Sequence, residues 1–302
     1  MTMNRTGESR FRNLADIELI DLLHTMGDGL PREVVDEILA RGPRMIPYLY
    51  VIVAEKSSWT RYLPEWWAAV HATYILGAFG TQETLPALLS ALRWSDAFDC
   101  EWVTEDLPSM FGRLGEPAYG PLLTIVRELP AGYGARAIAL SSMAAVALKE
   151  KTLKTPFLDL AARILADATE PVPLRQAAGN ILLDMRSNAH REELIRFGRE
   201  ESRRKDDIPE YEGVFYDGEV DEILASEDLN GDLAYYSREW LSFYDPDERE
   251  RRREFWEEEQ ANAGREGSRG EDEPGSDRRE NHTLCPCGSG KHFRDCCIKR
   301  VH

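Results

Sequence analysis

Four of the five cysteines in this 302-residue chain lie within thirteen positions near its C-terminus. The stretch reads CPCGSGKHFRDCC and starts at Cys285, so a Cys-x-Cys pair is followed after eight residues by an adjacent pair. Thiolates are soft anionic ligands, and four of them in a tetrahedron suit a structural zinc ion. Such a closed site has no open coordination position for catalysis. We therefore expect one structural Zn²⁺ and no zinc-based reaction.

The residues between the two cysteine pairs are suited to a small metal-dependent module. Gly288 and Gly290 offer turn positions, where backbone N–H groups can point at the thiolates. Phe293 is the one large apolar residue between the pairs. So short a segment buries too little apolar surface to fold alone, and we expect metal binding to supply its folding energy.

This stretch resembles the SEC-C motif, the zinc-binding tail first known from the C-terminus of the SecA translocation motor. The family pattern is Cys-Pro-Cys-Gly-Ser-Gly-Lys, a short basic and aromatic stretch, and then Cys followed by His or Cys. Every fixed position of that pattern matches residues 285–297. The resemblance implies that four cysteines are the zinc ligands: Cys285, Cys287, Cys296 and Cys297.

The contact partner of such a module is open to three interpretations. Family members contact a chaperone, and ribosome and lipid contacts are also described. Here the tail is locally basic through Lys291, Arg294, Lys299 and Arg300. Basic zinc knuckles can bind RNA, but Phe293 is the one aromatic residue available for stacking on bases. We therefore favour a protein partner, with RNA or the ribosome second and a structural cap third, and expect no DNA.

Other chemical motifs are weak or absent in the sequence. The GSGK stretch is no P-loop, because Cys285 occupies the first glycine position and His292 stands where Ser or Thr should follow the lysine. His71, on an apolar helix, is expected to be a packing residue. Cys100 lies among acids that raise its pKa and weaken it as a nucleophile. We expect no enzyme.

The composition is strongly acidic, with 54 Asp and Glu against 37 Lys and Arg and a net charge of −17. Such a surface repels phosphate, which disfavours nucleic acid and anionic membranes as partners of the main body. We find no stretch approaching the roughly 18 apolar residues of a membrane span and no N-terminal signal. Clustered cysteines kept reduced for metal fit a cytoplasmic protein.

Residues 13–205 read as successive helices, with apolar residues spaced three and four apart. A Pro-x-Leu tag marks the second helix of four pairs at intervals of 39, 35 and 35 residues, starting at Pro47, Pro86, Pro121 and Pro156. A helix pair repeated at this period is typical of α-solenoids, where neighbours stack into one core. The pattern resembles HEAT-like repeats, over about residues 31–205. We predict an all-α, HEAT-like α-solenoid of about five helix pairs, with an irregular bundle as the alternative.

The predicted domains follow from changes in composition. The solenoid is assigned to residues 9–205. Residues 206–260, rich in aromatics and acids, are predicted to form a capping segment that ends in a charged helix. Residues 261–281 contain no large apolar residue and are expected to be a flexible, disordered linker. Residues 282–302 hold the zinc knuckle.

Five of the seven tryptophans fall within residues 59–102, next to several acids. One interpretation is a groove for a basic or hydrophobic peptide, contacted by Trp59, Trp66 and Trp67, because tryptophan often anchors interfaces. The other is that they fill the core between repeats.

The function predicted from these features is a non-enzymatic adaptor. The acidic solenoid would grip a protein or peptide, and the tethered knuckle would contact a partner in a chaperone- or translocation-like role, so that two weak contacts act together. The first alternative is an RNA- or ribosome-associated protein that binds through the basic knuckle. The second is an enzyme with its active site in the concavity of the solenoid.

Overall fold

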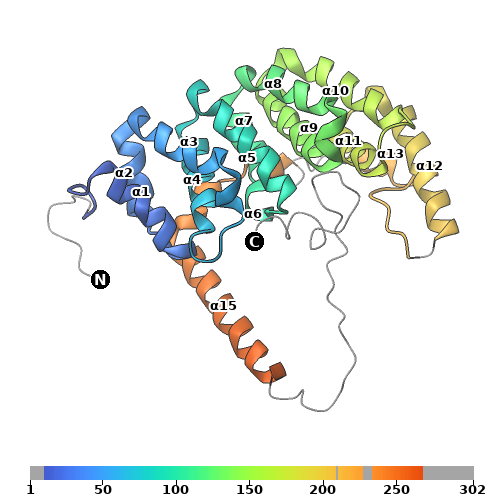
Figure 1. The fold of residues 1–302 in the computed structure, drawn as a ribbon. Helices are drawn as coiled ribbons and strands as arrows, with labels where there is room; N and C mark the ends of the chain where they lie inside the picture. Colours follow the sequence, from blue (N-terminus) through green and yellow to red (C-terminus); the bar gives the residue numbers. More distant parts are fainter. Residues whose placement is uncertain (1–9, 209, 227–232, 268–302) are drawn as a thin grey trace. The chain divides into compact units, whose positions relative to one another are not determined.

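A computed structural model describes residues 10–208, 210–226 and 233–267, and every regular element in these ranges is helical (Figure 1). The all-α prediction is therefore confirmed for the described chain. By its internal contacts the chain divides into two compact units. The first consists of the described residues up to 27 together with 33–240, and the second of 28–32 together with the described residues from 241 onward.

All ten segments predicted as helices between residues 31 and 205 are α-helical in the first unit. Its α-helices are α1 (Asp16–Thr25), α2 (Arg32–Arg41), α3 (Ile46–Ala54), α4 (Trp67–Phe79), α5 (Leu85–Ala97), α6 (Glu101–Thr104), α7 (Leu107–Leu114), α8 (Glu116–Arg127), α9 (Gly132–Lys149), α10 (Lys151–Ala166), α11 (Val172–Asp184), α12 (Arg191–Asp207) and α13 (Val220–Ala225). Short 3₁₀ turns connect them, at Gly27–Gly29, Gly42–Met45, Lys56–Trp59, Gln82–Thr84, Leu129–Ala131, Asn188–His190 and Tyr235–Ser237. A further 3₁₀ turn, Trp240–Tyr244, begins at the last residue of the unit.

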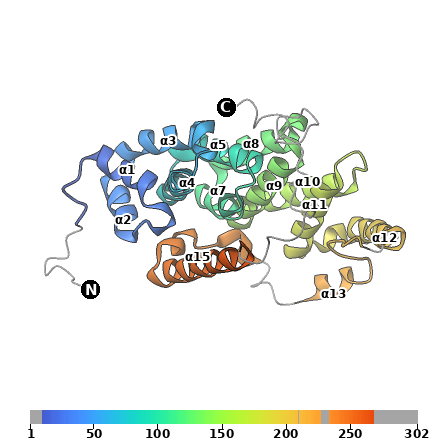
Figure 2. The ribbon, with the colours of Figure 1, turned by 60° about the horizontal axis from the view of Figure 1, so that its bottom comes forward.

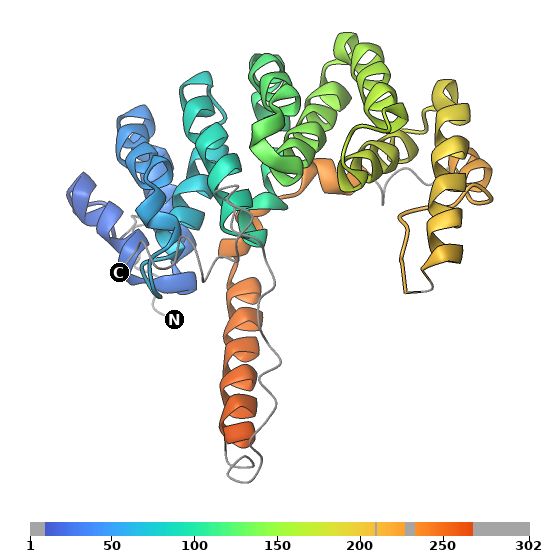
Figure 3. The ribbon, with the colours of Figure 1, turned by 45° about the vertical axis from the view of Figure 1, so that its right-hand side comes forward.

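Helices of the first unit pack on the helix two or three places along the chain as well as on the next one. α4 contacts α7, α7 contacts α9 and α9 contacts α11, and we call these four helices the α4–α11 row. α3 packs on α5, and α10 on α12. The helices accordingly lie side by side (Figure 3), and α13 packs on α11 and α12 at one end of the unit (Figure 2).

α4 lies in the middle of this packing. Twelve of its thirteen residues are buried, as expected of a helix that is apolar on all sides. It ends at Gly80, whose φ of 59° is the left-handed conformation that glycine adopts at helix C-termini. Because α4 has little exposed surface of its own, its side chains act mainly as core.

The segment Leu129–Lys149, which contains α9, is the one described stretch long and apolar enough to cross a membrane by length and composition. Its mean hydropathy of 1.3 differs from the sequence-based expectation of no such stretch, because alanines raise the average between its polar residues. The structure packs α9 against α7, α8, α10 and α11, with 56% of the window buried. A core helix has the same properties, and the absence of a membrane span stays a prediction.

The Pro-x-Leu tag does not mark a single register in the structure. Pro86 is the second residue of α5, and Leu88 two positions on is fully buried. Pro121 instead lies inside α8, whose first turn precedes it, and the fully buried residue is Leu122, one position on. The tag is thus shared in sequence, while the buried face shifts by one residue.

Arg136 of α9 is a buried cation that joins three helical segments. Its Nε donates to the carbonyl of Val126, near the end of α8, at 2.7 Å. A terminal guanidinium nitrogen donates to Glu170, just before α11, at 2.6 Å. The Arg136 side chain is 4% exposed and that of Glu170 is 16% exposed. The arginine therefore satisfies a helix-end carbonyl and a carboxylate that are both largely withdrawn from water.

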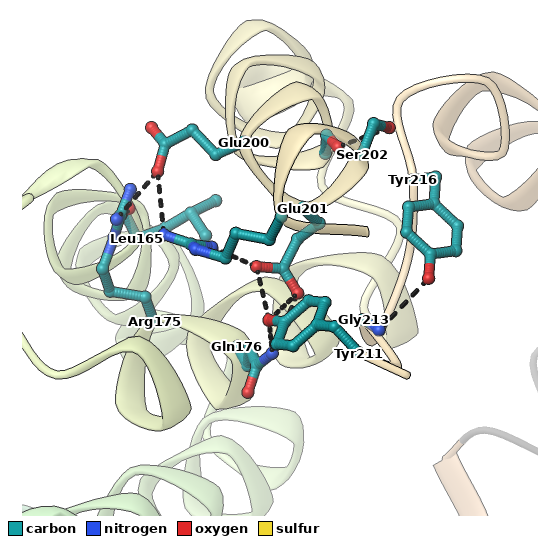
Figure 4. A network of polar contacts seen from close by, with 11 residues as sticks. Leu165, Arg175, Gln176, Glu200, Glu201, Ser202, Tyr211, Gly213 and Tyr216 are labelled. Carbon is teal, nitrogen blue, oxygen red and sulfur yellow. Dashed lines mark hydrogen bonds and ion pairs between the residues drawn. The ribbon is translucent and has the colours of Figure 1, made fainter. Parts of the chain in front are cut away.

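Arg175 of α11 repeats the first of these contacts at the same sequence distance. Its Nε donates to the carbonyl of Leu165, ten residues earlier, at 2.8 Å, as Arg136 does to its own partner. Its guanidinium also pairs with Glu200 of α12 at 2.9 Å (Figure 4). The repeated geometry shows that two successive helix pairs are connected in the same way.

Glu201 of α12 is a fully buried carboxylate at the centre of a polar network (Figure 4). The hydroxyl of Tyr211 lies 2.9 Å from it, the amide of Gln176 donates to it at 2.8 Å, and Arg204 pairs with it. Burial, followed by the contact with Glu201, raises the pKa of Tyr211. The network attaches the chain after α12 to both α11 and α12.

The second unit is organised around the start of α15 (Pro246–Gly267). The Arg252 guanidinium stacks on Phe243 at 3.6 Å from the ring centroid and donates to that residue's carbonyl at 2.8 Å. Trp256 donates its indole N–H to the carboxylate of Asp28 at 2.9 Å. Residues 28–32, far away in sequence, are thereby held against the helix.

The described elements run across two of the predicted boundaries. The described residues between 206 and 240 group with the first unit by their internal contacts, and the division between the units falls after residue 240. α15 continues to Gly267, so residues 261–267 of the predicted linker are helical. Alanine, arginine and glutamate in this stretch favour helix enough to offset its glycines. The rest of the predicted linker, 268–281, and the predicted knuckle, 282–302, lie outside the described residues.

Candidate functional site

The predicted zinc ligands, Cys285, Cys287, Cys296 and Cys297, lie outside the described residues. The same holds for the basic residues predicted to contact a partner, Lys291, Arg294, Lys299 and Arg300. In the described part of the chain, no group of three or more His, Cys, Asp or Glu side chains is placed to hold a metal.

Cys100, the fifth cysteine, is buried in the first unit with 2% of its surface exposed. Burial, only partly opposed by a backbone hydrogen bond, raises the pKa of its thiol to about 12. The thiol therefore stays protonated at neutral pH and serves as a small packing residue.

Trp59 and Trp94 donate hydrogen bonds to the end of α3. The Trp59 indole is 2% exposed and donates to the carbonyl of Val53 at 3.0 Å. Trp94, half-buried, donates to the carbonyl of Ala54 at 3.1 Å. Both carbonyls belong to the last turn of α3, where no helical N–H remains to pair with them. These tryptophans therefore stabilise a helix end, a role that sequence spacing does not reveal.

Of the other tryptophans in this region, Trp67 is core and two keep exposed surface. Trp67 is 4% exposed, and its ring centroid lies 5.5 Å from that of Trp102. Trp66 is half-buried and Trp102 is 39% exposed. Of the three tryptophans predicted to contact a partner, Trp59 and Trp67 thus fit the core-filling interpretation, and Trp66 alone keeps part of its ring accessible.

Two histidines have polar partners. His71 is fully buried, with Nε2 2.8 Å from the carbonyl oxygen of Gly27, as expected of a packing histidine. His190 lies between Ser187 and Asp159, with Nδ1 2.8 Å from the hydroxyl and Nε2 3.2 Å from the carboxylate. The Ser187 hydroxyl belongs to a residue only 4% exposed, and the contact closes a short turn. We assign this cluster to local structure.

The feature that sequence reasoning missed is the course of residues 233–240, which we call the inner segment. It lies within the first unit and contacts α7 and α9 along the α4–α11 row (orange in Figure 3). At one end Tyr236 donates its hydroxyl to Asp184, the last residue of α11, at 2.7 Å. At the other, Trp240 donates its indole N–H to the carbonyl of Tyr74 in α4 at 3.1 Å. Both aromatic residues are buried, at 5% and 8% exposed.

Side chains of α7 and of the residues just before it bind the middle of the inner segment. The Ser109 hydroxyl accepts the backbone N–H of Arg238 at 2.7 Å and lies 3.4 Å from the carbonyl oxygen of Tyr235, to which it donates. The Arg238 side chain pairs with Glu105 at 2.6 Å and lies 3.9 Å from Asp106. The α4–α11 row therefore holds a stretch that contains the 3₁₀ turn Tyr235–Ser237, through both its backbone and its side chains.

Asp106 is more buried than Glu105, the other acid that faces Arg238. Burial raises its pKa, and the Tyr74 hydroxyl and the nearby Arg238 oppose that rise. The Tyr74 oxygen lies 2.7 Å from a carboxylate oxygen of Asp106 and from the carbonyl oxygen of Trp102. The abundance of aromatics in residues 206–244 signalled that this region packs somewhere, but did not show where.

Comparison with known proteins adds one assignment. A family model described as the SEC-C motif matches residues 283–299. The chain carries a SEC-C motif. No curated protein and no solved structure matches the chain. The match covers the C-terminal end alone, so the SEC-C motif characterises that module and leaves the helical units to be interpreted from their own geometry.

The donor set of the SEC-C motif fits a zinc ion. SEC-C motifs are in general zinc-binding, and four thiolates are the ligands of many closed structural zinc sites. The motif contains all the cysteines of the chain except the buried Cys100. The chain's own residues are therefore sufficient in number and type for one four-coordinate ion.

Proposed function

We propose that this protein is a non-enzymatic, zinc-binding adaptor of the cytoplasm. The first unit, a HEAT-like α-solenoid, binds a protein or peptide. The SEC-C motif, folded around one structural Zn²⁺ held by Cys285, Cys287, Cys296 and Cys297, contacts a partner as well. The observation that carries the proposal is the SEC-C motif at residues 283–299, a closed metal module attached to an acidic helical chain.

The packing of the first unit supports the solenoid. From α7 to α11 the helices of the α4–α11 row contact the second helix along the chain, and α4 contacts α7, the third. Arg136 and Arg175 each donate to a carbonyl ten residues earlier, which is the kind of contact that recurs when helix pairs stack by translation. In such a stack each pair contacts its neighbours along an extended surface, which suits the binding of extended partners.

The acidic composition and the chemistry of the motif support a protein partner. A net charge of −17 disfavours phosphate-rich ligands of the helical units and favours basic proteins. With four thiolates, the zinc ion has no open position for substrate, so the module's role is folding and presentation. Joining two modest contacts in one chain increases the overall affinity for a partner that engages both.

The test compares captured partners and zinc content in matched variants. The tagged full chain, the double variant Cys296→Ser/Cys297→Ser and the control Cys100→Ala are purified from the same cells. We expect about one zinc per chain in wild type and control and none in the double variant. Mass spectrometry should find a protein partner that wild type and control retain and the double variant loses.

Other results would redirect the proposal. Absence of zinc from the wild type would rule out the metal module. Identical partners for all three chains would reduce the module to a cap. RNA retained by the wild type and lost in Lys291→Glu/Arg294→Glu would make the module an RNA contact.

A further inference from the structure

We propose that the α4–α11 row carries a binding site for a basic-aromatic peptide, and that the chain's own inner segment, residues 233–240, occupies this site in cis. The inference rests on the proposed role of the first unit in binding a protein or peptide. It adds the place of the site, the chemistry of its ligand and the way in which access to it is controlled.

The α4–α11 row binds the backbone of the inner segment through Ser109. Ser109 accepts the N–H of Arg238 at 2.7 Å and donates to the carbonyl of Tyr235 at 3.4 Å. These two groups are the first carbonyl of the 3₁₀ turn Tyr235–Ser237 and the N–H of the residue after it, and any peptide that forms the same turn presents them, whatever its side chains. A serine that satisfies a donor and an acceptor three residues apart fixes the position of a chain along the row.

Two buried aromatic residues anchor the inner segment on the row. Tyr236 and Trp240 are buried, and each donates one hydrogen bond, to Asp184 and to the carbonyl of Tyr74 respectively. Large aromatic residues with one polar donor are the usual anchors of peptide interfaces. Their spacing of four residues defines the ligand as aromatic-x-x-x-aromatic.

Between the two anchors the inner segment carries a cation that faces two carboxylates. Arg238 pairs with Glu105 at 2.6 Å and faces Asp106 at 3.9 Å, and its side chain is 41% exposed. An exposed pair of this kind contributes little to folding. It discriminates between ligands instead, because an acid at the same place would face two carboxylates. The preferred ligand therefore carries a cation midway between its aromatic residues.

Occupation in cis makes the site selective. A tethered segment competes at an effective concentration in the millimolar range, so a free peptide of equal intrinsic affinity binds the intact protein poorly. Ser237, Arg238 and Glu239, between the anchors, are exposed, which leaves a partner room to compete for the middle of the site. The apparent affinity for a partner rises with the fraction of molecules in which the segment has left the row.

The test uses the variant Arg238→Glu, which places an acid of the inner segment against Glu105 and Asp106 and leaves the row unchanged. A fluorescent peptide with the natural sequence of residues 233–241 is titrated into full-length chains and followed by anisotropy. We expect about five- to ten-fold tighter binding to Arg238→Glu than to wild type, from loss of an exposed ion pair and the new repulsion. The control Arg191→Glu breaks the exposed pair between Arg191 of α12 and Asp221 of α13 and should bind like wild type.

A second measurement needs no variant. Excess peptide added to the wild-type chain should speed hydrogen exchange at the Arg238 amide, which Ser109 protects, and leave exchange in α12 unchanged. A peptide with glutamate in place of its arginine should leave exchange at the Arg238 amide unchanged.

The two experiments separate this inference from the proposed function. If the natural peptide binds Arg238→Glu no better than wild type and leaves the Arg238 amide protected, the inner segment is a permanent part of the core and the inference is wrong. The adaptor role survives that result if the pull-down still recovers a partner that depends on the first unit.

Discussion

Replacement of Arg136 by methionine tests whether burial determines how much an ion pair contributes to the stability of this fold. The change keeps most of the side-chain volume and removes the guanidinium. It leaves the Val126 carbonyl, near the end of α8, and the Glu170 carboxylate without their donor. Neither group can fully recover water, because the Arg136 side chain is 4% exposed and that of Glu170 is 16% exposed.

The magnitude follows from these exposures. Removing one partner of a buried, hydrogen-bonded pair costs about 3–5 kcal/mol in the free energy of unfolding. Glu170 keeps some contact with solvent, so we expect the lower end, about 3 kcal/mol. The matched control is Arg191→Met, because Arg191 pairs with Asp221 at the same 2.6 Å but with both side chains about half exposed or more. Solvent screens that pair, and we expect a much smaller loss from the control.

Urea denaturation, followed by far-UV circular dichroism, measures the free energy of unfolding of both variants and of the wild type. The three chains are compared with the same slope of that free energy against urea concentration. Equal losses for the two variants would refute the reasoning, since the two pairs share the same distance and differ in burial. A double variant, Arg136→Met/Glu170→Leu, should recover part of the loss, because it removes the unpaired carboxylate.

Three further outcomes follow from single residues. Gly198→Ala should cost about 1–3 kcal/mol, because a Cβ there would meet backbone atoms of residues 216 and 217, the nearest at 2.5 Å. Thermal unfolding against the wild type measures this loss. Trp59→Phe should cost about 1–3 kcal/mol in the free energy of unfolding measured in urea, because it leaves the buried Val53 carbonyl without its donor. The hydrogen bond from Arg41 lowers the pKa of Asp16. Arg44 lowers this pKa further, and desolvation opposes the shift. A carboxyl group whose pKa is lowered by folding stabilises the fold at pH values above its unfolded-state pKa. That stabilisation is lost as the pH falls through the folded-state pKa. Asp16→Asn should therefore lower the Tm at about pH 7 and have little effect at about pH 2, and equal effects at both would contradict it.

The helices could be predicted from the sequence because their signals are local. Apolar residues three and four apart, prolines near helix starts and glycines after helix ends all act within one or two turns. The ten predicted helical segments are present for that reason. The SEC-C motif was equally accessible, since its pattern is contiguous and the family match covers residues 283–299.

The remaining features depend on contacts that no local pattern encodes. The tryptophans were assigned by composition to a groove or to the core, and spacing alone could not show that Trp59 and Trp94 donate to carbonyls at the end of α3. The inner segment was read as part of a cap because its partners lie in distant helices. Its anchor Trp240 bonds to Tyr74, 166 positions away.

That separation has a consequence for the order of folding. The helix pairs of the first unit close short loops, whereas the contacts of Trp240 and Tyr236 need α4 and α11 already in place, because each binds a residue of a finished helix. Closing a long loop costs entropy that only a preformed surface repays. We therefore expect the inner segment to dock last during folding and to be the first part of the unit to leave when the protein begins to unfold.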